Sequence, residues 1–205
     1  MIKLIGLTGG IVSGKSQAAA FFQEEGVPVI GMDAVGHELL QHDTAIKDAL
    51  VGMFGSGILD GERPSREKIG RLVFQDQEAL KKLNALLHPA IAQETVRRAR
   101  ALEQDGHGVV LIEAALFAED YEKESWLDGL ILISAPEALR IERLQKSRSM
   151  SLPEIRQRMA QQADPEKKRP LADRVIHNDK SQEDLRRQVQ EAARELLCRF
   201  PRRKS

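Results

Sequence analysis

Residues 1–17 read MIKLIGLTGGIVSGKSQ, in which an apolar run leads directly into a segment rich in glycine, serine and lysine. From Gly9 to Ser16 the chain matches the pattern G-x-x-x-x-G-K-[ST] in full. A chain of ordinary glycine content contains this pattern by chance in about 1% of cases. The apolar run predicts a strand over Ile2–Leu7, and the periodicity after the loop predicts a helix over Ser16–Glu25. This context favours a phosphate-binding loop over a flexible turn.

The residue types of the loop suit a nucleoside triphosphate. Loop N–H groups turn inward, and the following helix adds the partial positive charge of its N-terminus. Lys15 is expected to bridge the β- and γ-phosphates, and the Ser16 hydroxyl to ligate Mg²⁺. The predicted nucleotide-binding residues of the loop are Gly10, Ile11, Val12, Ser13, Gly14, Lys15, Ser16 and Gln17.

A second strand is predicted over Val27–Ile30, and it is followed by an acidic residue, Asp33. Strand, loop, helix and strand in this order predict a parallel sheet with a crossover helix, whose carboxyl edge lies beside the phosphate loop. A carboxylate there can take or orient the proton of an acceptor hydroxyl. Asp33 also has the position of an N-cap for a helix over Ala34–Gln41. The two roles are compatible, and we favour the catalytic one.

Residues 34–104 carry helical periodicity almost throughout, whereas apolar strands return at Val109–Ile112 and Gly129–Ile133. The helices expected in this region are Ala34–Gln41, Ala45–Phe54, Ser65–Phe74, Gln77–Leu87 and Ala90–Glu103. The expected fold is therefore α/β, with a core of residues 1–33 and 105–205 built on a parallel sheet and a helical insertion at 34–104.

Composition excludes several classes of protein. Lys+Arg and Asp+Glu both number 31, which argues against a nucleic-acid or membrane-surface partner. The single cysteine, Cys198, excludes an internal disulfide and a cysteine-rich zinc site. Apolar runs are well short of the ~20 residues that a membrane span needs, and Gly9 and Gly10 interrupt the first run too early for a signal peptide. We expect a cytoplasmic protein with a small-molecule substrate, as a monomer or small homo-oligomer.

Other motifs of the sequence distinguish among the classes of protein that contain a phosphate-binding loop. A guanine-reading Asn-Lys-x-Asp segment is absent, which argues against a small GTPase. Motor and helicase ATPases need a hydrophobic strand that ends in Asp. The segment VVLIEAALF has Glu113 at its strand end, so this class is less favoured but not excluded. Glu113 could support Mg²⁺ from a second layer, pair with Lys15, or pair with a surface base. A small-molecule kinase needs a carboxylate after the second strand, which Asp33 supplies.

Several segments resemble the dephospho-coenzyme A kinase family, whose members use ATP to phosphorylate the ribose 3′-hydroxyl of dephospho-CoA in the last step of coenzyme A synthesis. The resemblance covers most of the chain, and Gln162 precedes the last segment at the family's spacing. The segments are GLTGGIVSGKS (6–16), VPVIGMDAVGHELL (27–40), LVFQD (72–76), LNALLHP (83–89) and ADRVIHN (172–178).

The resemblance implies a three-layer α/β P-loop kinase fold, in which the insertion at 34–104 binds the substrate and a helical lid covers about 140–170. It also implies ATP and Mg²⁺ as cofactors and assigns roles to individual residues. Asp33 would carry the catalytic carboxylate, and Thr8 would lie near the transferred phosphate. The insertion would hold the CoA moiety, with His88 shaping its floor, although His88 before a proline also marks a predicted helix junction. Arg143 would close on the phosphates from the lid, and Asn178 would lie near the adenine.

The chain departs from the family pattern at several positions. Val12 replaces a glycine, and a β-branched residue disfavours positive φ, so either φ is negative there or the loop is strained. Gln17 replaces a hydroxyl residue, Gly31 replaces a carboxylate, and Ser147 stands at the second lid arginine. Two alternatives therefore stay open: a kinase of another small acceptor such as a nucleoside monophosphate, and a weakly active nucleotide-binding protein.

Overall fold

The computed structural model describes residues 1–115, 126–148, 151–160 and 165–203. The chain forms two compact units, one of Met1–Ile30 with Ala99–Ser205 and the other of Gly31–Arg98. The sequence-based boundaries were residues 34 and 104, and the assignment of the second unit to the CoA moiety stays a prediction. No helix within the described ranges is long and apolar enough to cross a membrane.

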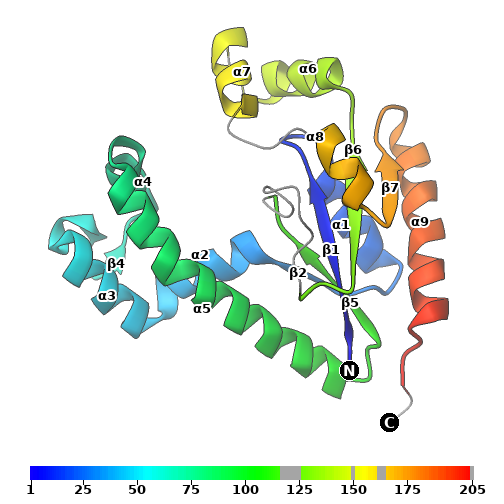
Figure 1. Cartoon of the computed structure of the whole chain (residues 1–205), viewed down its shortest axis with the longest axis horizontal. Helices are drawn as coiled ribbons and strands as arrows, with labels where there is room; N and C mark the ends of the chain where they lie inside the picture. Colours follow the sequence, from blue (N-terminus) through cyan, green and yellow to red (C-terminus); the bar gives the residue numbers. More distant parts are fainter. Residues whose placement is uncertain (116–125, 149–150, 161–164, 204–205) are drawn as a thin grey trace. The chain divides into compact units, whose positions relative to one another are not determined.

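The first unit contains a five-stranded sheet with the order β2-β5-β1-β6-β7 (Figure 1). The strands are β1 (Lys3–Gly9), β2 (Val29–Gly31), β5 (Val109–Glu113), β6 (Gly129–Ser134) and β7 (Arg174–His177). β1 pairs in parallel with both β5 and β6, and β6 pairs in parallel with β7. The predicted parallel α/β sheet is confirmed, and the phosphate-loop strand β1 is at its centre.

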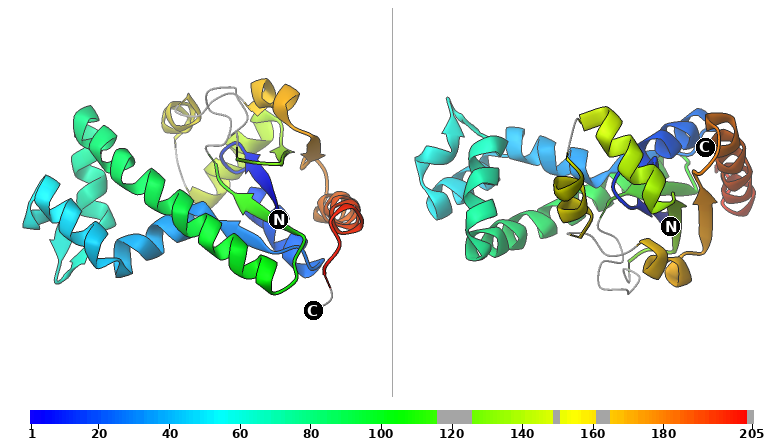
Figure 2. Two further views of the ribbon diagram at one scale, coloured as in Figure 1. Left: turned by 60° about the horizontal axis from the view of Figure 1, so that its bottom comes forward. Right: turned by 90° about the horizontal axis from the view of Figure 1, so that it is seen from above.

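Helices α1 (Lys15–Glu24) and α9 (Gln182–Arg199) lie side by side on one face of this sheet (Figure 2). Side chains at alternate strand positions pack against them: Ile5, Leu7, Val109, Leu111, Ile131 and Ile133. The intervening residues Val110, Ile112, Leu130 and Leu132 are also buried, and α8 (Pro165–Lys168) contacts β6. Burial on both faces explains why these strands are continuous apolar runs in the sequence.

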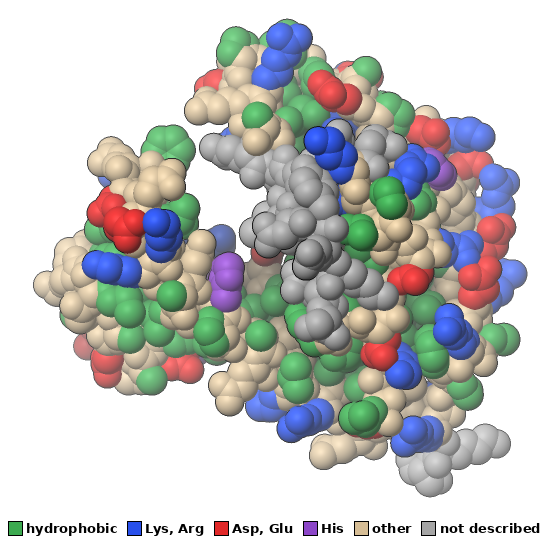
Figure 3. Space-filling view, viewed as in Figure 1, with side chains coloured by type: hydrophobic (Ala, Val, Ile, Leu, Met, Phe, Trp, Pro, Cys, Tyr) green, Lys and Arg blue, Asp and Glu red, His purple; other side chains and the backbone are tan. Residues whose placement is uncertain are grey.

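Helices α6 (Glu137–Arg148) and α7 (Leu152–Ala160) follow β6, and a short 3-10 turn, η2 (Arg169–Leu171), leads towards β7. Acidic and basic side chains alternate along the α9 edge of the molecule (Figure 3). Arg187 pairs there with Asp184, and Arg174 pairs with Glu195. Positive and negative side chains are thus mixed along this edge, in keeping with the equal numbers of acidic and basic residues in the whole chain.

The second unit is mainly helical. Its elements are α2 (Met32–His42), α3 (Thr44–Phe54), η1 (Ser56–Ile58), α4 (Arg66–Gln75) and the first part of α5 (Gln77–Gln104). The unit also contains a hairpin that was not predicted from the sequence, formed by β3 (Leu59–Asp60) and β4 (Arg63–Pro64) with a connecting turn through Gly61 at φ 60°. Helices α3 and α4 begin at side-chain N-caps, Asp43 and Ser65.

Helix α5 corrects the prediction of two helices with a junction at His88. The structure has one helix of 28 residues with Pro89 inside it. Leu86 and Leu87 before the proline, and Ile91 after it, pack into the same apolar core. Full burial of such a side chain contributes about 1.5–3 kcal/mol, so the buried Leu87 and the partly buried Leu86 and Ile91 together offset the ~3 kcal/mol cost of an internal proline.

An ion-pair network connects α5 with α2 inside the second unit. Glu94 accepts hydrogen bonds from Arg97 at 2.6 Å and from Arg98 at 2.8 Å. Arg98 also donates to Glu38 of α2 at 2.5 Å. The hydrogen bonds from Arg97 and Arg98 lower the pKa of Glu94 to about 2. The network therefore depends on an ionised Glu94.

Candidate nucleotide-binding site

The predicted phosphate loop connects the central strand β1 to helix α1, as the motif requires. The Ser13 N–H donates to the Gly10 carbonyl at 3.0 Å and closes a tight turn. A Cβ on Gly9 would lie 2.5 Å from Ser13 Oγ and 2.7 Å from the Ile133 carbonyl. Gly14 has φ 94° and forms the N-cap of α1. Both motif glycines are thus required by close approach or backbone conformation.

Val12 has φ 49°, and no other non-glycine residue in the described part of the chain has positive φ. It is the third residue of the Gly10–Ser13 turn, where a positive φ favours glycine or asparagine. The alternative of a negative φ at Val12 is therefore wrong, and the alternative of a strained loop is confirmed. Left-handed backbone at a side-chain-bearing residue costs about 1–2 kcal/mol, and β-branching adds crowding.

The carbonyl groups of the loop are held by side chains from two distant segments. Arg143 of α6 donates to the Val12 carbonyl at 3.3 Å and to the Asn178 carbonyl at 3.1 Å. The Asn178 side-chain amide donates to the Ser13 carbonyl at 2.8 Å, and this side chain is buried. A Cβ on Gly14 would lie only 2.0 Å from Asn178 Nδ2. Arg143 and Asn178 thus contact the loop backbone directly.

The N-terminus of α1 suits a bound anion. The first intrahelical bond runs from the Ala18 N–H to the Gly14 carbonyl at 3.0 Å. The N–H groups of Lys15, Ser16 and Gln17 precede this bond, in the turn where a helix leaves its donors without intrahelical partners. Phosphate oxygens can accept from these donors while the helix dipole favours their negative charge.

Lys15 and Ser16 converge on one carboxylate, Glu113, the last residue of β5. Glu113 Oε1 lies 2.6 Å from Lys15 Nζ and 3.1 Å from Ser16 Oγ. The Lys15 and Glu113 side chains are 13% and 19% exposed, so the pair is largely shielded from water. Pairing of Glu113 with Lys15 is confirmed, and the surface-base alternative is wrong. A hydroxyl and a carboxylate oxygen also fit Mg²⁺, which takes one or two protein oxygens together with phosphates and waters.

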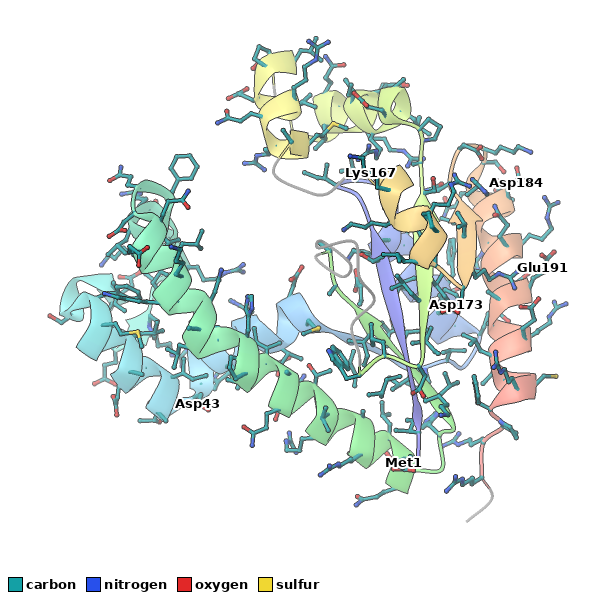
Figure 4. The ribbon with its side chains drawn as sticks, in the orientation of Figure 1. Met1, Asp43, Lys167, Asp173, Asp184 and Glu191 are labelled. Carbon is teal, nitrogen blue, oxygen red and sulfur yellow. The ribbon has the colours of Figure 1, made fainter. Side chains whose placement is uncertain are left out.

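Two further polar side chains have structural partners. Thr8 is fully buried in β1, and its hydroxyl donates to the Ala115 carbonyl at 3.4 Å. Asp173 precedes β7 (Figure 4), and its carboxylate accepts from the Leu130 N–H at 2.7 Å. Asp173 thereby fixes the end of β7 opposite to Asn178. Asp173 lies in the segment ADRVIHN, which carries part of the family resemblance, but this role of its carboxylate was not predicted from the sequence.

Comparisons with known proteins give one consistent result. A family model described as dephospho-CoA kinase matches residues 3–184. The dephospho-CoA kinase of Nitrosomonas europaea is 37% identical over 198 residues, which cover 96% of this chain and 96% of the relative. That of Lactobacillus acidophilus is 34% identical over 192 residues, covering 93% and 96%. The chain belongs to the dephospho-CoA kinase family.

Solved structures agree with this family assignment. A protein from Thermus thermophilus has a TM-score of 0.79 and 32% identity, covering 95% of this chain and 98% of that one. Dephospho-CoA kinase from Campylobacter jejuni has a TM-score of 0.66 at 24% identity, covering 95% and 97%. A shikimate kinase from Acinetobacter baumannii, with a TM-score of 0.52 at 14% identity and coverage of 97% and 95%, shares the fold alone. The predicted P-loop kinase fold is confirmed.

Two residues that the family resemblance singles out, Asp33 and His88, belong to the second unit. Asp33 is exposed in the first turn of α2, which begins at Met32 with Gly31 as its N-cap and no side-chain cap. The N-cap interpretation of Asp33 is therefore wrong, because extended backbone at Gly31 starts the helix earlier. Among the described residues, no hydrogen bond or ion pair engages the Asp33 carboxylate.

His88 is exposed on α5. The roles of Asp33 and His88 in the dephospho-CoA kinase reaction stay predictions. Gln162 and the side chains of Ser147 and Arg148 lie outside the described residues.

Proposed function

We propose that this chain transfers the γ-phosphoryl group of ATP to the ribose 3′-hydroxyl of dephospho-CoA, giving coenzyme A and ADP. The observation that carries the proposal is the family match over residues 3–184, which includes a complete phosphate loop. Family membership supports a kinase that phosphorylates an alcohol. We expect it to act in the cytoplasm on small molecules, without a nucleic-acid or membrane partner.

The loop and Lys15 are proposed to hold the phosphates of ATP. Loop N–H groups at the start of α1 bind phosphate oxygens, and Lys15 turns from Glu113 towards the β- and γ-phosphates. Ser16 and the Glu113 carboxylate would hold Mg²⁺, which when bound neutralises charge on those oxygens. Thr8 is the residue before the last one of the central strand, close to the loop in sequence, and is proposed to lie near the transferred group.

Transfer itself requires one proton acceptor and one in-line displacement. The acceptor 3′-oxygen forms a bond to Pγ while the bond between Pγ and the bridging oxygen of ADP breaks. Asp33, exposed and without a partner in the described part of the chain, orients the hydroxyl and takes its proton. Arg143 uses part of its guanidinium on backbone carbonyls, and its remaining donors are proposed to close on the phosphates.

The second unit is proposed to bind the CoA moiety. His88 is an exposed imidazole on α5 and would contribute to the floor of that site. Asn178, whose amide already contacts the phosphate loop, is proposed to lie near the adenine ring of ATP. These assignments rest on family resemblance at the level of single residues.

Measurement of acceptor-dependent ADP release tests the proposal. Purified protein is incubated with ATP and Mg²⁺, with dephospho-CoA, AMP or another nucleotide as acceptor, or with none. ADP formed only with dephospho-CoA is the expected result. Turnover with AMP instead would identify a kinase of another acceptor. Binding of ATP without acceptor-dependent ADP, in protein with a normal thermal transition, would identify a nucleotide-binding protein and refute the kinase.

A further inference from the structure

We propose that Asn178 and Arg143 are positioning residues that hold Val12 in the left-handed conformation that the phosphate loop of this chain requires. Val12 has φ 49° at the third position of a turn closed by the Ser13 N–H and the Gly10 carbonyl. Glycine accepts this conformation freely, whereas valine resists it. Something other than local preference must therefore keep the turn in place.

Relaxation of Val12 towards ordinary backbone angles would reorient the peptide group that joins Val12 to Ser13 and would displace the following one, which joins Ser13 to Gly14. The carbonyl of Val12 accepts a hydrogen bond from Arg143, and the carbonyl of Ser13 accepts one from Asn178, at 3.3 Å and 2.8 Å. Reorientation of either peptide group breaks its bond. A lost bond in a buried setting leaves an unsatisfied polar group, which is costlier than an exposed one. The two side chains thus oppose the relaxation that valine favours.

The contacts are positioned to act together. Arg143 also donates to the Asn178 carbonyl at 3.1 Å, so one guanidinium joins the loop to the segment after β7. Asn178 is only 5% exposed, and its amide occupies the space that a Cβ on Gly14 would need. Asn178 therefore touches the loop at two successive positions, beside Ser13 and beside Gly14. A side chain that only bound a nucleotide base would not need either contact.

A double-mutant cycle between Val12→Gly and Asn178→Ala tests this inference. The measured quantity is the dissociation constant for ADP with Mg²⁺, by calorimetry on the full chain, which requires no acceptor and is independent of whether dephospho-CoA is the substrate. With Val12 present, Asn178→Ala is expected to weaken ADP binding about tenfold or more, because the loop relaxes. In the Val12→Gly background, the same substitution is expected to cost about threefold or less.

Two further variants complete the design. Arg143→Lys keeps the positive charge but cannot bond two carbonyls with one planar fork, so its loss of ADP affinity should also shrink in the Val12→Gly background. Gln190→Ala is the control. It removes a side-chain amide on α9 that donates a hydrogen bond to the Glu25 carboxylate at 2.8 Å and does not contact the phosphate loop. It should leave ADP affinity unchanged within about twofold in both backgrounds.

Equal losses of affinity in the two backgrounds would overturn the inference, because the effects of Asn178 and Val12 would then be independent. If Asn178→Ala fails to fold, the cycle with Arg143→Lys decides by the same criterion. Thermal transitions accompany each binding measurement, so that a loss caused by unfolding is recognised.

Discussion

Replacement of Glu113 by glutamine would separate two roles of this carboxylate, its pairing with Lys15 and its proposed support of Mg²⁺. Glutamine keeps the size and can still accept from Lys15 Nζ and Ser16 Oγ, which lie 2.6 Å and 3.1 Å from Glu113 Oε1, but it removes the charge. At an effective dielectric of about 20, two unit charges at about 4 Å attract by about 4 kcal/mol before desolvation. The net loss for a partly buried pair is about 1–3 kcal/mol. For a chain of this size the thermal midpoint should fall by roughly 3–10 °C.

The effect on nucleotide binding should have opposite signs with and without metal. In EDTA, the carboxylate of Glu113 competes with phosphate oxygens for Lys15 and repels them, so Glu113→Gln should bind ADP about tenfold more tightly. With Mg²⁺, the variant loses the carboxylate that we propose supports the metal, and such losses are typically about 10- to 100-fold in metal affinity. Titration of ADP by calorimetry in the two buffers measures both effects on one preparation.

Glu113→Asp is the matched control for charge. It keeps the carboxylate and should bind metal-free ADP as the parent does, within about threefold. If Glu113→Gln changed the affinity for ADP in the same direction in EDTA and in Mg²⁺, the reasoning would be refuted. The charge of Glu113 would then have the same effect on metal-free and on metal-bound nucleotide.

Three other substitutions have definite expected outcomes. Gly14→Ala puts a Cβ 2.0 Å from Asn178 Nδ2 at a residue with φ 94°, so ADP affinity should fall more than about tenfold and the thermal midpoint should drop; calorimetry with unchanged affinity would contradict this. Asp33→Asn should keep ATP affinity within about twofold and lose at least about 100-fold in acceptor-dependent turnover, and full turnover would remove Asp33 from the mechanism. Because hydrogen bonds from two arginines lower the pKa of Glu94 from 4.5 to about 2, its contribution to stability is present above pH 4.5 and is lost as pH falls towards 2. Urea unfolding between neutral and acid pH should therefore show a shallower acid decline for Glu94→Gln, and parallel curves would exclude this role.

The parts of the fold that the sequence predicts well are those governed by local pattern. Strands β1, β5 and β6 are short apolar runs in the sequence, and their burial on both faces removes the alternation that an exposed face would impose. The phosphate loop was equally clear, since its glycines are needed by backbone geometry within a few residues. Strand ends differ by one or two residues because the chain leaves the sheet gradually.

The parts that could not be predicted depend on distant contacts. A proline at position 89 is a local stop signal, yet apolar packing on both sides of it keeps α5 continuous. Asp33 looked like an N-cap, yet Gly31 starts the helix. The pairing of Glu113 with Lys15 was one of several alternatives until the register placed Glu113 opposite Leu7, beside the loop.

The position of Val12 shows why such contacts change the meaning of a substitution. By itself, valine in place of glycine weakens the case for an active loop, because it disfavours the observed φ of 49°. Arg143 and Asn178 are 131 and 165 residues away in sequence from the loop residues they contact. Arg143 donates to the Val12 carbonyl, which relaxation of Val12 would turn, and Asn178 donates to the Ser13 carbonyl that follows it. A strained residue persists where its surroundings determine its conformation more strongly than its own preference does. The departure at Val12 is therefore compatible with nucleotide binding as long as Arg143 and Asn178 are intact, and the loop tolerates their loss only when glycine replaces Val12.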